Sequence, residues 1–112
     1  MFILENVTKS YASRRGTVHA LREATLTIER QSFVTVTGPS GSGKTTLLLT
    51  LGGLIRPTSG RLMFHGNNLG DYDEPRLAAY RNRNVGFVLQ SFNLIPYLSA
   101  YENVMVPMSL GK

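Results

Sequence analysis

The sequence predicts a mixed α/β fold built in layers, and two observations carry that prediction. Strand-like segments fill the first third of the chain, and a leucine-rich helical pattern follows them over 44–54. Between the two, a glycine-rich turn joins a strand directly to a helix. The 112 residues, 42% hydrophobic and 17% charged, are enough for one modest globular domain.

The first third of the chain is expected to form antiparallel strands and then one further strand. Apolar and polar residues alternate over 24–28, which is typical of a half-buried antiparallel strand, and 2–8 is strand-like though less regular. Segment 10–16 is polar and ends in glycine, so we expect a loop there. The β-branched run 33–37 stops at a Gly-Pro pair, which predicts a strand followed by a tight turn.

Helices and short strands are expected to alternate in the middle of the chain. Leucines spaced three and four residues apart predict a helix over 44–54, ended by a pair of glycines. A short strand over 61–65 leads into a turn at 66–68. Asp73 is expected to cap a second helix that runs to about Arg83.

The last quarter continues this order. An apolar strand is expected over 85–89, followed by a loop over 91–97. A short helix is predicted over 99–106, because Ser99 is a favoured cap and Glu102 stands at the third helical position.

Composition excludes several classes of function. The absence of cysteine excludes disulfides and thiolate metal sites, and it fits a reducing compartment. The most apolar stretch, 47–55, is too short to cross a bilayer, so we expect a soluble chain that meets a membrane through a partner. Twelve basic and seven acidic residues give a net charge of +5, and the basic residues form no run. A solvated basic surface is therefore expected, and specific nucleic-acid binding is not.

Segment 38–45 matches the P-loop pattern G-x-x-x-x-G-K-[ST] at every fixed position. Its residues are Gly38, Pro39, Ser40, Gly41, Ser42, Gly43, Lys44 and Thr45. A triphosphate needs several backbone N–H groups aimed at one centre, and glycines let the backbone wrap closely around it. The helix that follows adds unpaired N–H groups and the positive end of its dipole.

Two side chains of the P-loop complete the predicted phosphate site. Lys44 supplies a positive charge for the β- and γ-phosphates, and the hydroxyl of Thr45 is placed to bind magnesium. The alternative is a chance match in a glycine-rich loop. The β-branched strand before the loop and the leucine-rich helix after it favour a true phosphate site.

A P-loop does not identify a family, because many ATPases, GTPases and kinases use one. Around it stand Tyr11, the segment 56–60 (Arg-Pro-Thr-Ser-Gly), Gln90 and the segment 101–104 (Tyr-Glu-Asn-Val). Together these resemble the ATP-binding subunits of ABC transporters over essentially the whole chain. The run 84–107 is most similar to the subfamily of macrolide exporters, lipoprotein-releasing transporters and a related cell-division ATPase.

The resemblance implies a site for ATP with Mg²⁺. Tyr11 is expected to stack on adenine and Val18 to flank the base, although Tyr11 packing over the strands is the alternative. Thr46 joins the P-loop residues in binding the nucleotide. Gln90 is expected to reach the magnesium ion and the attacking water, and to act in catalysis together with Lys44.

The resemblance also implies partners. A membrane-spanning permease subunit is expected to contact 91–98, so the protein would lie in the cytoplasm against the inner face of the cell membrane. The full-length ATPase is expected to form a homodimer. The apolar side chains of 91–98 either form an exposed surface for the permease or cover the chain's own core. They are Phe92, Leu94, Ile95 and Tyr97.

The fold implied is the amino-terminal portion of an ABC-type P-loop ATPase, with an antiparallel β subdomain and part of a parallel core sheet with helices. Its expected parts are antiparallel strands (1–31), the P-loop core as far as the glutamine (32–90), and the start of the partner-contacting segment (91–112). The family's signature, Walker B and switch motifs are absent from the 112 residues. The chain alone is therefore predicted not to hydrolyse ATP. The alternatives to a transporter subunit are a non-hydrolysing nucleotide-binding fragment and an ABC-type ATPase that acts on DNA.

Overall fold

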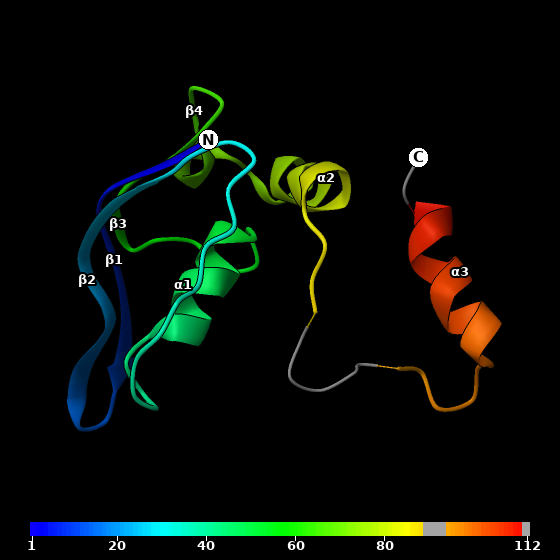
Figure 1. Cartoon of the computed structure of the whole chain (residues 1–112). Helices are drawn as coiled ribbons and strands as arrows, with labels where there is room; N and C mark the ends of the chain where they lie inside the picture. Colours follow the sequence, from blue (N-terminus) through cyan, green and yellow to red (C-terminus); the bar gives the residue numbers. More distant parts are fainter. Residues whose placement is uncertain (89–93, 111–112) are drawn as a thin grey trace.

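A four-stranded antiparallel sheet with two helices beside it forms the body of the computed structural model, which describes residues 1–88 and 94–110 (Figure 1). The strands are arranged in the order β2-β1-β3-β4. In chain order the elements are β1 (Phe2–Ser13), β2 (Gly16–Ile28), α1 (Lys44–Leu51), β3 (Ser59–Phe64), β4 (Asn67–Asn68), the 3-10 turn η1 (Leu69–Asp71), α2 (Glu74–Asn84) and α3 (Ala100–Leu110). Within these ranges no helix has both the length and the hydropathy needed to cross a bilayer.

The β1–β2 hairpin is longer than predicted, because the polar segment 10–16 continues the ladder instead of forming a loop. Tyr11 pairs with Val18, and Ser13 pairs with Gly16 across a two-residue turn. The Ser13 hydroxyl also donates a hydrogen bond to the Gly16 carbonyl at 2.7 Å. This end of the hairpin is exposed to solvent. Solvent exposure favours polar residues in a strand as it does in a loop.

The pairing of β1 with β2 shifts register at three places, where the strands bulge. Asn6 and Glu23 adopt left-handed backbone conformations, with φ of 52° and 44°. The Asn6 amide donates to the Thr25 hydroxyl, and the Glu23 amide donates to the Thr8 hydroxyl, each at 3.0 Å. Threonine side chains therefore replace the backbone partners that the bulges remove.

The core lies between the sheet and the two helices. Its buried side chains are Leu4, Val7, Leu62, Leu69, Leu77 and Tyr80. The Tyr80 hydroxyl donates to the Leu51 carbonyl at 2.8 Å. Burial raises the pKa of Tyr80 to about 12, so the hydroxyl is protonated and can donate at neutral pH. Arg81 donates to the Gly53 carbonyl at 2.8 Å. Side chains of α2 thus hold the carbonyl groups at the end of α1, which would otherwise lack partners.

The predicted helices form, and both predicted caps are confirmed. The Asp73 carboxylate accepts a hydrogen bond from the Arg76 amide at 3.0 Å at the start of α2. Ser99 and Glu102 exchange two hydrogen bonds of 3.1 Å before α3, which is the reciprocal capping box. The bounds differ slightly: α1 ends three residues early at the glycine pair, and α3 continues to Leu110.

Two strand predictions are wrong in the part of the chain that the structure describes. Segments 33–37 and 85–88 form no strand, and Leu89 lies outside the described residues. Phe33 is 96% exposed, and Val88 is fully exposed. A β-branched run favours extended backbone, but a strand also needs a partner for its ladder. The expected parallel sheet therefore has no paired strands in the described ranges, and the antiparallel sheet extends beyond residue 31 to include β3 and β4.

We predict that Gly60→Ala destabilises the fold more than Gly66→Ala. The two glycines have similar positive φ angles, 87° and 80°, so alanine brings a similar backbone strain of roughly 1–2 kcal/mol to each. A Cβ atom at Gly60 would lie 2.2 Å from the Asn6 carbonyl oxygen, whereas one at Gly66 would meet nothing within 4 Å. Urea unfolding should show a loss for Gly60→Ala at least about twice that for Gly66→Ala. Equal losses would contradict the close packing of β3 on the bulge.

Candidate functional site

The P-loop lies between the extended segment 32–37 and α1, and its backbone turns tightly. The Ser42 amide donates to the Pro39 carbonyl at 3.2 Å, and Gly41 has a φ of 80°. Gly43, with a φ of 97°, is the residue before α1, and no side chain caps the helix there. Within residues 1–88 and 94–110, no side chain therefore caps the first-turn N–H groups of α1, and these groups can bind an anion.

Gly43 also fixes where the loop sits. A Cβ atom at this position would lie 2.3 Å from the Ala20 carbonyl oxygen and 3.5 Å from the Leu21 side chain, both on β2. Any residue other than glycine would push the loop away from the strand. The close approach places the P-loop beside the part of β2 that carries Val18.

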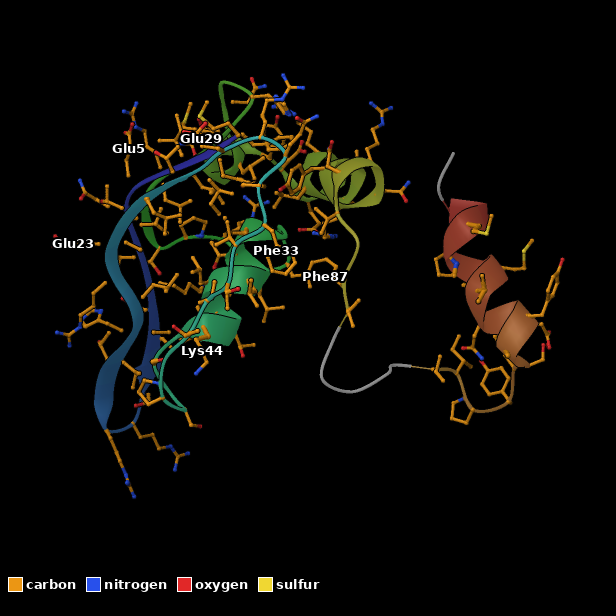
Figure 2. All side chains as sticks on the ribbon, viewed as in Figure 1. Glu5, Glu23, Glu29, Phe33, Lys44 and Phe87 are labelled. Carbon is orange, nitrogen blue, oxygen red and sulfur yellow. The ribbon has the colours of Figure 1, made fainter. Side chains whose placement is uncertain are left out.

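Lys44 is held over the loop that precedes it. Its ammonium donates hydrogen bonds to the Gly38 carbonyl and, at 2.8 Å, to the Pro39 carbonyl. Figure 2 shows the side chain at the amino end of α1. An ammonium has three N–H donors, so one remains for a ligand. A positive charge and the positive end of a helix dipole thus lie together.

A cleft of about 480 Å³ opens between the P-loop and β2. It is lined by Val18, His19, Ala20, Ser40, Gly41, Gly43, Lys44, Thr45 and Thr46. Lys44 is the charged residue of this lining, and the hydroxyls of the other P-loop residues add donors. The volume falls within the range of small-molecule sites in proteins. The chemistry of the lining suits a phosphate group.

The residue predicted to stack on a base lies next to this cleft. Tyr11 is the cross-strand partner of Val18, which lines the cleft, and its side chain is 44% exposed. The structure therefore brings together Tyr11, Val18 and the P-loop from three separate parts of the chain. Three predicted P-loop residues do not line the cleft: Pro39 and Ser42 form the turn of the loop, and the Gly38 carbonyl accepts a hydrogen bond from Lys44.

A second, larger cleft of about 560 Å³ lies on the other side of α1 and shares Thr45 with the first. It is lined mainly by apolar residues of α1 and of segment 85–88, and none of the described residues in its lining is charged. Figure 2 shows the Phe87 side chain directed toward α1, and a Cβ atom on Gly52 would come within 2.2 Å of its ring. This cleft is unsuited to phosphate despite its size.

The structure describes only part of the predicted catalytic and partner-contacting segment. Gln90 and Phe92 lie outside the described residues. Leu94 and Tyr97 are 64% and 85% exposed, so these two side chains do not cover the chain's own core. In Figure 1, α3 stands apart from the sheet.

The sequence did not predict the hydrogen bonds of Asn103 and Thr58, although both residues lie in segments that resemble the family. The side chain of Asn103, in the Tyr-Glu-Asn-Val segment, accepts from the Ile95 amide at 2.8 Å and donates to the Ser99 carbonyl at 2.9 Å. It ties the preceding loop to α3. Thr58, in the Arg-Pro-Thr-Ser-Gly segment, accepts a hydrogen bond from the Ser10 amide at 2.9 Å, next to Tyr11.

Comparisons with known proteins identify the family of this chain. The model of the ABC transporter family matches residues 21–111. The chain is 44% identical over 108 residues to the uncharacterized ABC transporter ATP-binding protein YknY of Bacillus subtilis, with 96% of this chain and 47% of that protein covered. It is 47% identical over 106 residues to the macrolide export ATP-binding/permease protein MacB of Syntrophobacter fumaroxidans, with 95% and 15% covered.

A solved structure gives the same result for the fold. The dimeric ATP-binding cassette MJ0796 of Methanocaldococcus jannaschii, bound to ADP and Pi, matches with a TM-score of 0.95 and 41% identity. All of this chain and 48% of that one are covered. The chain thus spans about half the length of YknY and of the cassette, and a smaller share of MacB.

We predict that Gly43→Ala weakens phosphate binding. The added methyl group displaces the loop from β2 and disturbs the amide groups that face the cleft. Calorimetric titration with inorganic tripolyphosphate should show an affinity at least about tenfold lower than that of the unchanged chain. Gly66→Ala, with a similar φ of 80° and open space around it, is the control for backbone strain. Unchanged affinity in Gly43→Ala would contradict the assignment of the loop.

Proposed function

The chain belongs to the ABC transporter family, and we propose that it forms part of an ATP-binding subunit that couples ATP to the work of a membrane complex. The observation that carries the proposal is the P-loop cleft. Uncapped amide groups of α1 and an ammonium with one unused donor converge there on a space of about 480 Å³. Few ligands other than a polyphosphate would use this arrangement.

The proposed binding mode divides the nucleotide between the two elements that form the cleft. Amide groups of Gly41 to Thr46 and the Lys44 ammonium would bind the β- and γ-phosphates. The base would lie by Tyr11 and Val18, where the hairpin offers an aromatic ring and an aliphatic side chain. The close approach of Gly43 to β2 supports this proposal, because it fixes the loop against the hairpin.

Thr45 fits a magnesium ion bound with ATP. Its hydroxyl lies directly after Lys44 at the start of α1, on the lining of the cleft, and oxygen is the ligand that Mg²⁺ prefers. Gln90 would contribute its side-chain oxygen and sense the γ-phosphate, as the family resemblance implies. When bound, the ion would neutralise charge on the phosphates.

Hydrolysis is proposed for the longer ATPase and not for these 112 residues. Activation of water needs a basic group, and magnesium is usually held by a carboxylate as well. In the described part of the chain, the residues lining the P-loop cleft include no carboxylate. The residues alone therefore fit a nucleotide-binding unit that does not hydrolyse. The other half of the active site would come from the rest of the protein and from a second subunit of a homodimer.

We further propose that a membrane-spanning permease contacts 91–98 and so holds the subunit in the cytoplasm at the inner face of the membrane. Exposure of Leu94 and Tyr97 supports this, because large apolar side chains in solvent are typical of partner surfaces. An ATPase acting on DNA has less support, since the twelve basic residues form no run.

We predict that Lys44→Met weakens ATP binding at least about tenfold while leaving the fold intact. The methionine keeps the stem of the side chain but removes the charge that faces the cleft. Titration calorimetry gives the affinity. Thermal unfolding should show that ATP at 100 times its dissociation constant stabilises the unchanged chain by about 2.7 kcal/mol. Arg83→Met, which removes one charge from the end of α2, is the control. Equal ATP affinity in Lys44→Met would refute the phosphate site.

We predict that the 112-residue chain with saturating ATP and magnesium releases phosphate no faster than a sample of Lys44→Met. The reason is the lack of a carboxylate at the described cleft. A coupled phosphate assay measures the rate. Turnover that stops on Lys44→Met would show that these residues hydrolyse ATP by themselves.

A further inference from the structure

Lys9 contacts the aromatic ring that the proposed function places under the base. Its ammonium nitrogen lies 5.2 Å from the centroid of the Tyr11 ring. This is within the distance at which a cation is attracted to the electron-rich face of an aromatic ring. Tyr11 is 44% exposed, so part of the residue's surface is open to a ligand.

The backbone beside this pair is braced from a distant part of the chain. The Ser10 amide, between Lys9 and Tyr11, donates to the Thr58 hydroxyl at 2.9 Å. The Thr58 amide donates in turn to the Thr8 carbonyl at 2.7 Å. These bonds hold the main chain of β1, but they do not fix the rotation of the Tyr11 side chain. The contact with Lys9 acts on the ring itself.

We propose that Lys9 is a positioning residue for the nucleotide base: its ammonium covers one face of the Tyr11 ring and holds the ring so that the other face receives adenine. The inference rests on the proposed function, in which Tyr11 stacks on the base. An aromatic ring has two faces, so the cation and the base do not compete. A ring that is already oriented loses less freedom when the base binds, which strengthens binding.

This role differs from simple attraction between a lysine and a negatively charged ligand. General attraction acts on every polyphosphate, whether or not it carries a base. Orientation of Tyr11 acts only on ligands that have a base to stack. The ratio of the affinities for ATP and for inorganic tripolyphosphate therefore separates the two effects.

The experiment measures both affinities by calorimetry for the unchanged 112-residue chain and for variants. Lys9→Met should weaken ATP binding about threefold, as expected for an exposed cation–π contact, and should leave tripolyphosphate binding unchanged. Lys9→Arg keeps a cation over the ring and should restore ATP affinity to within about twofold. Arg15→Met removes one charge from the turn of the same hairpin and should leave the ratio of the two affinities unchanged. Thermal unfolding of each variant checks the fold.

The outcomes separate failure of this inference from failure of the proposed function. If Lys9→Met weakens both ligands equally, Lys9 acts through its charge alone. If it strengthens ATP binding, Lys9 occupies the face that the base needs. Either result overturns the inference, as does an unchanged ratio in Lys9→Met when Tyr11→Ala lowers the ratio. If Tyr11→Ala leaves the ratio unchanged, or the unchanged chain binds no ATP, the proposed function fails and the inference with it.

Discussion

The close approach of Gly43 to the Ala20 carbonyl is the contact on which the site depends. It presses the P-loop against β2, and β2 carries Val18 and pairs with the strand that carries Tyr11. This contact keeps the P-loop close in space to the hairpin that carries the aromatic residue. The far end of α1 is fixed as well, by hydrogen bonds from Tyr80 and Arg81 of α2. The helix whose amino end lies at the P-loop cleft is thus held at both ends.

The features that could be predicted from the sequence are those that short-range interactions determine. The P-loop and the caps at Asp73 and Ser99 each depend on residues within a few positions of one another, so their patterns are visible in the chain. The predictions of strands over 33–37 and 85–89 are wrong in the described residues, because an apolar β-branched run favours extended backbone but does not specify a strand to pair with. The length of the β1–β2 hairpin was missed because exposed strands and loops share polar residues.

The site shows the same division between local and distant contacts. The residues predicted to bind phosphate are consecutive in the sequence, and six of them line one cleft: Ser40, Gly41, Gly43, Lys44, Thr45 and Thr46. The support of Tyr11 was not visible, because Thr58 reaches Ser10 across 48 positions and Lys9 acts through the direction of its side chain. No short sequence pattern predicts the apolar cleft beside α1 or the exposure of Phe33 and Val88. They are properties of surfaces that only the folded arrangement creates.

The most direct test of the account is a titration of the ¹⁵N-labelled chain with magnesium ATP, followed by amide chemical shifts. If the P-loop cleft binds the triphosphate, the largest shift changes will fall on the amides of residues 41–46, with smaller changes at Val18 and Tyr11 near the base. A loop whose amides do not respond, or changes confined to Leu48 and Phe87 of the apolar cleft, would contradict the central claim that ATP is bound through the uncapped start of α1.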